Sequence, residues 1–284
     1  EEGMKLESGM DILIYGDLPE GAGLSSSASL EVLTGFFLCD LFGFELSKEK
    51  LALLGQRAEN KFCGVNCGIM DQFSVAAGRK DHAIYLNTSD LSFEYIPIHI
   101  PDAKIVIANS NKPHTLNESK YNERRQECET ALQELQKVIG IEHLCDLTEE
   151  EFTTYQAAIL DETRKRRVRH AVYENSRVKK AAEALKNNAI AEFGELMNAS
   201  HHSMSEDYEV TGEEMDALVQ AAWQQEGVIG SRMTGGGFGG STVSIVKNNC
   251  ITSFIEGTGK VYTERTGLTA DFYVVEIGSG PVLQ

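Results

Sequence analysis

The sequence predicts an α+β protein in which short strands and long helices occupy separate stretches of the chain. Runs rich in β-branched residues or with alternating polarity indicate short strands before residue 110 and again near the C-terminus. Long, charged patterns with helical spacing fill the stretch between them. Such segregation favours the α+β class. Pro97 and Pro101 mark a change of pattern, so the predicted domains are residues 1–100 and 101–284.

The first predicted domain should begin with a strand and continue mainly in helices. Met10 to Tyr15 reads as a strand, and a turn with Pro and Gly follows it. Apolar residues then recur at helical spacing over residues 24–42, where Ser25 or Ser26 suits the N-cap. The later elements expected in this part are helices at 48–62 and within 66–78, and strands at 83–86 and 93–98; a further strand, at 103–108, is expected just after the boundary.

The second predicted domain is richer in long helices. Helical spacing of apolar residues predicts them at 117–138, 163–187, 190–203 and 213–224. Two further strands are expected at 242–246 and 271–277.

Composition and charge exclude several classes of function. The chain has 284 residues, 42% of them hydrophobic, and a formal net charge of −17, which disfavours binding to nucleic acid or to an anionic membrane. No apolar run reaches the roughly 18 residues of a membrane span, and position 1 is not Met and no secretory apolar region follows it, so we expect a soluble, cytoplasmic protein. The basic stretch from Arg164 to Arg169 is interpreted as a solvated helix face.

Six scattered cysteines in a chain of this size do not indicate a disulfide framework. Cys63 and Cys67 have no second Cys or His pair at zinc-finger spacing, so they are interpreted as free thiols.

A loop of small residues between the first strand and the first helix is the strongest local signal. It reads Pro-Glu-Gly-Ala-Gly-Leu-Ser-Ser-Ser-Ala-Ser over residues 19–29. Glycines let the backbone approach an anion, and a helix N-terminus offers free N–H groups and partial positive charge to phosphate. Because Gly-Lys-Ser/Thr does not occur, this is not a Walker A loop.

Two further features support phosphate chemistry. Glu59 and Asp71 flank a turn that contains glycine, and phosphoryl transfer needs carboxylates to hold Mg²⁺ and to orient an acceptor hydroxyl. The glycine cluster at residues 235–240 is too dense for an ordinary hairpin, which indicates a close backbone approach beside the active site.

These segments, in this order, resemble the GHMP small-molecule kinases and, among them, the galactokinases. The resemblance rests on the loop at 19–29, on Cys-Gly-Ile-Met-Asp-Gln-Phe at 67–73 and on the glycine-rich segment at 233–241. It extends to residues 109–111, 121–128, 200–201 and 207–210, so it covers nearly the whole chain. The implied fold is a partial N-terminal ribosomal-S5-like α/β domain and a C-terminal ferredoxin-like α+β domain.

The resemblance also implies a reaction, in which ATP phosphorylates the anomeric hydroxyl of galactose in the presence of Mg²⁺. Asp71 matches the catalytic aspartate, Ser27 and Glu59 match the Mg²⁺ ligands, and Gly68 and Tyr121 lie at the sugar site. The active-site glycine segment is Gly235, Gly236, Gly237, Phe238 and Gly239. The residues that match the ATP phosphate loop are Gly21, Ala22, Gly23, Leu24, Ser25, Ser26 and Ser27.

One family signature is absent from these residues. Galactokinases carry an Arg and then Glu-His-Thr-Asp-Tyr before the phosphate loop, and no Glu-His-Thr-Asp occurs here. We therefore expect the chain to be a fragment that is inactive alone, or to work with the missing segment as a separate chain. The alternative activities are an N-acetylgalactosamine kinase and a non-catalytic sensor of galactose and ATP. The complete loop and Asp71 disfavour the sensor.

Overall fold

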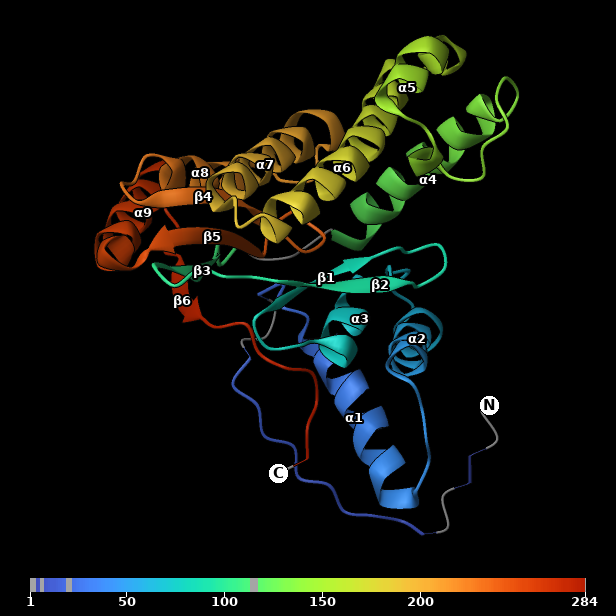
Figure 1. Cartoon of the computed structure of the whole chain (residues 1–284), viewed down its shortest axis with the longest axis vertical. Coiled ribbons are helices and arrows are strands. Elements are labelled where there is room, and N and C mark those ends of the chain that lie inside the picture. The colour runs from blue at the N-terminus through green and yellow to red at the C-terminus, as the bar shows by residue number, and fades with distance from the viewer. Residues whose placement is uncertain (1–3, 6–7, 19–21, 113–116, 284) are drawn as a thin grey trace. The chain divides into compact units, whose positions relative to one another are not determined.

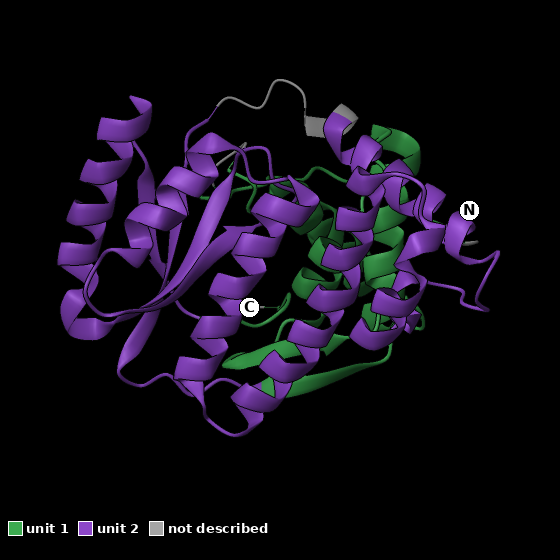
Figure 2. Cartoon of the chain, turned by 90° about the horizontal axis from the view of Figure 1, so that it is seen from above, with its two compact units in different colours: residues 1–96, 277–284 green, residues 97–276 purple. Residues whose placement is uncertain are grey.

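The computed structural model describes the chain except for residues 1–3, 6–7, 19–21, 113–116 and 284 (Figure 1). The chain forms two compact units, shown in different colours in Figure 2. Unit 1 contains residues 1–96 and 277–284, and unit 2 contains residues 97–276. The last eight residues thus return to the unit that the chain builds first.

Unit 1 is a group of helices with a small sheet. Its core joins Val32 of the first helix, Leu51 and Ala52 of the second, and Phe73 and Ala76 of the third, all of them buried. The elements are α1 (Ser26–Phe42), α2 (Lys48–Ala58), the π-helical turn η1 (Glu59–Cys63), α3 (Met70–Ala77), and the strands β1 (His82–Leu86) and β2 (Phe93–Pro97), which form a two-stranded sheet. Apart from the first strand, the predicted elements of this part of the chain are confirmed.

The strand predicted at Met10 to Tyr15 is wrong. This segment has no regular secondary structure, and 97% of Leu13 and 92% of Tyr15 are exposed. A strand needs a partner for its N–H and C=O groups, and no described residue pairs with this segment.

Unit 2 is built from a four-stranded antiparallel sheet and a set of helices (Figure 1). The strand order is β4-β5-β3-β6, with Val106 of β3 opposite Ser244 of β5 and Val274 of β6. The strands are β3 (Ala103–Asn109), β4 (Val228–Thr234), β5 (Ser241–Lys247) and β6 (Asp271–Val275). The helices and helical turns are α4 (Asn117–Leu135), η2 (Leu144–Asp146), α5 (Glu149–Tyr155), η3 (Gln156–Ala158), α6 (Glu162–Lys186), α7 (Ile190–Ser203), η4 (Met204–Tyr208), α8 (Glu213–Trp223), η5 (Asn248–Cys250) and α9 (Ile251–Thr266).

The helices of unit 2 form its core in two ways. Ala222 of α8 and Phe254 of α9 pack against Val106 and Val246 of the sheet. α7 approaches β4 closely because both elements carry a glycine at the contact, where a Cβ on Gly230 would lie 2.5 Å from the Cα of Gly194. No helix among the described residues has the length and apolar character to cross a bilayer.

One strand and two α-helices among the described residues of unit 2 were not predicted, namely β4, α5 and α9. α5 begins with a capping box in which Thr148 and Glu151 bond reciprocally, a signal that the sequence does carry. α9 contains Gly257 and Gly259, which lower its helix propensity, so that its formation depends on packing.

The interpretation of residues 164–169 as a solvated face is also wrong. Only 1% of the Arg167 side chain is exposed, and it is bonded to groups on two other elements. Arg164 pairs with Glu134, and Arg169 pairs with Asp207. These basic residues face acidic partners from α4 and η4, which a local reading of α6 cannot show.

Candidate active site

The described part of the phosphate loop leads directly into α1. Pro19, Glu20 and Gly21 lie outside the described residues, while Ala22 is buried and Ser26 is the first residue of α1. Ser25 occupies the N-cap position with a left-handed backbone (φ 57°), and its side chain makes no capping hydrogen bond. The prediction that Ser25 occupies the N-cap position is therefore confirmed, but the expected hydrogen bond from a backbone amide to its side chain is absent. The first amides of α1 do not donate to the Ser25 hydroxyl, and such amides at a helix N-terminus suit an anion.

Asp71 lies in the first turn of α3, close to this loop. The Ser25 hydroxyl lies near enough to the Asp71 carboxylate to favour its charged form. Burial raises the pKa of Asp71 above its ordinary value, the negative charge of Glu59 raises it further, and the Ser25 hydroxyl acts in the opposite direction. The structure thus brings the predicted catalytic carboxylate, the phosphate loop and the predicted metal ligand into mutual range. A carboxyl group with a raised pKa suits proton transfer near neutral pH.

Glu59 has a carboxylate neighbour that sequence reasoning missed. The ligand atoms of Glu31, Glu59 and Cys63 lie within 4.8 Å of one another. The pKa of Glu31 is raised to about 7. Burial and the adjacent Glu59 raise this pKa, and a 3.0 Å hydrogen bond from Gln72 Nε2 offsets part of the increase. The available signal was spacing, because Glu31 stands one helical turn after Ser27 on the same face of α1.

This pair of carboxylates fits a hard divalent cation. Glu59 Oε2 is shielded from solvent and receives no hydrogen bond from the described residues. Two like charges in contact are unfavourable unless a proton or a cation lies between them, and carboxylate oxygens are the ligands that Mg²⁺ prefers. The donor set therefore agrees with Mg²⁺. Cys63, which is exposed, adds a softer thiol beside it.

The remaining predicted residues are distributed over both units. Leu24 is half-buried in the phosphate loop, and Ser27 is exposed in the first turn of α1. Gly68 is exposed in the loop between η1 and α3. Tyr121 belongs to unit 2, in α4, and is half-buried.

The glycine-rich segment lies beside Tyr121 in unit 2. A Cβ on Gly236 would stand 3.9 Å from Tyr121 Cδ2. Gly237 has φ 84°, and a Cβ there would lie only 2.2 Å from the carbonyl oxygen of Val210, so no larger residue fits. The next residue, Phe238, donates its N–H to that same carbonyl at 2.6 Å. The close backbone approach expected for this segment is real, and its partner is the turn after η4.

Comparison with known proteins places this geometry in a family. Residues 1–79 match the sequence profile described as GHMP kinases N terminal domain, and residues 181–249 match GHMP kinases C terminal. The galactokinase of Fusobacterium nucleatum is 53% identical over 277 residues, which are 97% of this chain and 71% of that one. The galactokinase of Clostridium acetobutylicum is 54% identical over 280 residues, 99% of this chain and 72% of that one.

Solved structures agree with the sequence matches. The galactokinase of Lactococcus lactis, crystallised with galactose, superposes with a TM-score of 0.91 at 48% identity, over 93% of this chain and 68% of that one. L. major mevalonate kinase, with a TM-score of 0.58 and 17% identity, shares the fold. Nothing in these relatives supports the expectation that a missing N-terminal segment is a separate chain. By profile, sequence identity and fold, the chain belongs to the GHMP kinase family.

Proposed function

We propose that the protein transfers the γ-phosphate of ATP to the anomeric hydroxyl of galactose, giving galactose 1-phosphate and ADP. The observation that carries this proposal is the approach of the Ser25 hydroxyl to the Asp71 carboxylate, which brings a helix start suited to anions next to a carboxyl group of raised pKa. The similarity to galactokinases of about half identical sequence supports the choice of sugar. The expected compartment is the cytoplasm.

In this proposal the loop residues hold the nucleotide and Asp71 serves the acceptor. Backbone amides of residues 21–27 bind the phosphates at the start of α1. The Asp71 carboxylate orients the anomeric hydroxyl and takes its proton, while the sugar oxygen forms a bond to the γ-phosphorus. The bond from that phosphorus to the bridging oxygen breaks, and ADP leaves. Because the transition state of phosphoryl transfer is loose, orientation and charge matter more than the strength of the base.

Ser27 and Glu59 are the proposed Mg²⁺ ligands, and Glu31 is added to them because of its contact with Glu59. Bound Mg²⁺ neutralises charge on the β- and γ-phosphates.

Tyr121 and Gly68 are the proposed sugar contacts, and the glycine-rich segment 235–239 is proposed to belong to the active site. The packing of Tyr121 beside Gly236 supports this assignment for the segment. We also propose that the units correspond to two GHMP domains that divide near residue 100.

The deciding experiment is turnover by the purified full-length enzyme. ADP release should require Mg²⁺ and galactose together, and mass spectrometry with phosphorus NMR should identify a phosphate on the anomeric oxygen. N-Acetylgalactosamine and mevalonate serve as competing acceptors, and each should give less than a tenth of the rate. Saturable binding of galactose and ATP without ADP release would instead identify a sensor.

A further inference from the structure

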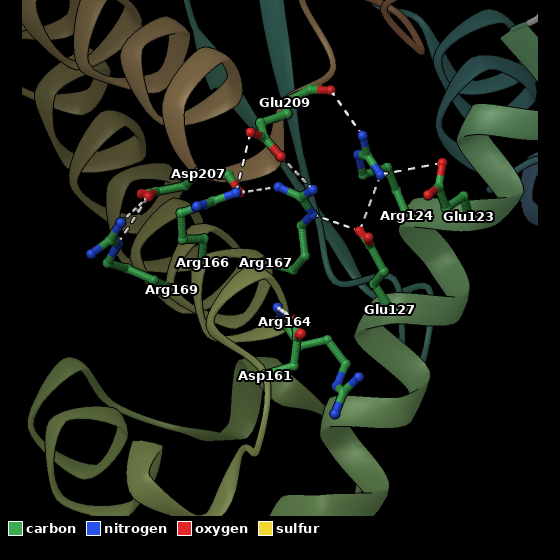
Figure 3. A network of polar contacts seen from close by, with 10 residues as sticks. All are labelled: Glu123, Arg124, Glu127, Asp161, Arg164, Arg166, Arg167, Arg169, Asp207 and Glu209. Atoms are coloured by element: carbon green, nitrogen blue, oxygen red, sulfur yellow. Dashed lines mark hydrogen bonds and ion pairs between the residues drawn. The ribbon is translucent and has the colours of Figure 1, made fainter.

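Arg167 is an unusually enclosed cation with three separate partners. It comes from α6, and only 1% of its side chain is exposed. Its guanidinium donates to Glu127 Oε2 on α4, to the backbone carbonyl of Asp207 in η4, and to Glu209 Oε2 just after η4, each at 2.6 Å (Figure 3). The fixed planar fork of an arginine can reach several acceptors at once, which a lysine ammonium on a flexible stem reproduces poorly.

The bond from Arg167 secures a strained residue. Glu209 has a left-handed backbone (φ 54°, ψ 49°), a conformation that is unfavourable for a residue other than glycine. Arg166 Nη2 also donates to the Glu209 carboxylate at 3.2 Å, and Arg124 Nη2 donates to its carbonyl at 3.5 Å. Three arginines from two helices therefore hold this turn in a geometry that its own backbone disfavours.

This turn also contacts the glycine-rich segment, through Val210. Val210 directly follows Glu209, and its N–H donates to the carbonyl of Met204 at 3.1 Å, which closes η4. Its carbonyl receives the N–H of Phe238 at 2.6 Å and fills the space where Gly237 has no side chain. Any displacement of Val210 therefore displaces the segment.

A second chain of contacts connects Arg167 to the glycine-rich segment. Glu127, which accepts from Arg167, also accepts from Arg124 Nη1 at 3.2 Å. The Arg124 guanidinium lies 6.0 Å from the centre of the Phe238 ring, and the Lys120 ammonium lies 5.3 Å from it. Both routes end at Phe238, beside Gly236 and Tyr121.

We infer that Arg167 is a positioning residue for the sugar side of the active site, acting through Glu209 and Val210 on the glycine-rich segment and through Glu127 on α4. The inference rests on the proposed function, because that function gives Tyr121 and the segment their place at the galactose site. Replacing Arg167 should therefore loosen the segment and raise KM for galactose much more than KM for ATP.

The test compares Arg167→Lys with Arg164→Lys in the full-length enzyme. Arg164 also joins α6 to α4, through a 2.7 Å pair with Glu134, but that pair includes neither Glu209 nor Asp207. Arg167→Lys should raise the galactose KM at least tenfold and speed hydrogen exchange of the Phe238 amide at least tenfold. Arg164→Lys should change both quantities less than twofold. Equal effects of the two variants would reduce Arg167 to a helix-packing residue and overturn the inference.

Glu209→Gln keeps the inference testable if Arg167→Lys does not fold. It should raise the galactose KM and the Phe238 exchange rate in the same direction. The galactose KM of the double variant should not exceed that of the more impaired single variant, because Arg167→Lys and Glu209→Gln both break the route through Glu209. A double variant whose increase in KM is the product of the two single increases would contradict that route. Turnover of the unaltered enzyme is measured first. An enzyme inactive on galactose refutes the proposed function, whereas the exchange measurement still decides whether Arg167 holds the segment.

Discussion

The Ser25 hydroxyl approaches the Asp71 carboxylate although the two residues belong to segments of unit 1 that lie far apart in the sequence. Ser25 precedes α1 and Asp71 lies in the first turn of α3, so two helix starts meet here. The hydroxyl of Ser25 is available because it caps no amide of its own helix. The carboxyl group proposed to receive the sugar proton is thereby held against the loop proposed to bind phosphate.

Replacing Asp71 by Asn should abolish phosphate transfer and spare nucleotide binding. The amide keeps the shape of the side chain but cannot accept the proton, so we expect kcat to fall by about 10²–10⁴-fold. Calorimetric titration should give an ATP affinity within threefold of that of the unaltered enzyme. Turnover close to normal would remove Asp71 from the mechanism.

Removing the hydroxyl of Ser25 should move the acid limb of the pH–rate profile to higher pH. The Ser25 hydroxyl lowers the pKa of Asp71, against burial and Glu59, which raise it. Without that hydroxyl the pKa rises, and the active carboxylate form appears only at higher pH. Ser25→Ala and Ser25→Gly differ in backbone strain at φ 57° but share the loss of the hydroxyl. Both should show the shift in kcat against pH; a shift in only one would assign the effect to the backbone.

Glu59→Gln should weaken Mg²⁺ binding and at the same time stabilise the metal-free protein. The change removes one of two adjacent negative charges, whose repulsion helps to raise the pKa of Glu31 to about 7. Burial is the larger cause of that shift, so at pH 8 we expect only a modest increase in the unfolding free energy of the metal-free protein. The apparent dissociation constant of Mg²⁺, taken from the dependence of activity on Mg²⁺ concentration, should rise at least tenfold. Glu31→Gln is the companion variant, and unchanged Mg²⁺ dependence in it would exclude Glu31 from the metal site.

Gly237→Ala should destabilise the protein, while Gly236→Ala should be tolerated. At Gly237 a Cβ would meet the Val210 carbonyl at 2.2 Å, and φ is 84°, so we expect a loss of at least about 2 kcal/mol. At Gly236 the nearest atom is Tyr121 Cδ2 at 3.9 Å, an ordinary contact. Thermal unfolding of both variants measures the difference. Equal Tm values would show that the segment does not dock on Val210 in solution.

His170 should make the folded state less stable as the pH falls below neutral. Burial lowers its pKa to about 4, from an ordinary value of 6.5. Its ring stacks on Tyr208 and Nδ1 lies 2.9 Å from Ser203 Oγ. Between pH 6.5 and 4, His170 is therefore protonated in the unfolded chain but remains neutral in the folded chain. The free energy of unfolding decreases over that range as the pH falls.

The size of this effect can be isolated with His170→Gln. From pH 7.5 to pH 5 the histidine accounts for a loss of about 2 kcal/mol, which the glutamine variant should not show. Urea unfolding at both pH values gives the two differences. Identical pH dependence in the two proteins would mean that His170 is protonated in the folded state.

The local sequence predicts most elements correctly because their signals are local. The apolar spacing of α1, α2 and α6 and the turn before α3 each lie within one segment. The strand predicted at Met10 to Tyr15 fails because strand formation also requires a hydrogen-bonding partner, which no segment can indicate for itself. β4 was missed because Gly230 weakens its strand signal, although that glycine is what admits α7.

By itself the sequence determined the local pattern from which the chemistry of the site is predicted. A loop of glycines and serines before a helix, followed by Glu59 and Asp71, favours phosphate and metal as ligands. Only the tertiary structure decided which side chains share that site. Glu31 is a proposed metal ligand because it lies close to Glu59. Arg167 is one basic residue among several in the sequence, but in the structure it is buried and bonded to both α4 and η4. The physical reason is that burial and charge pairing are sums over neighbours distant in sequence, which only the folded chain brings together.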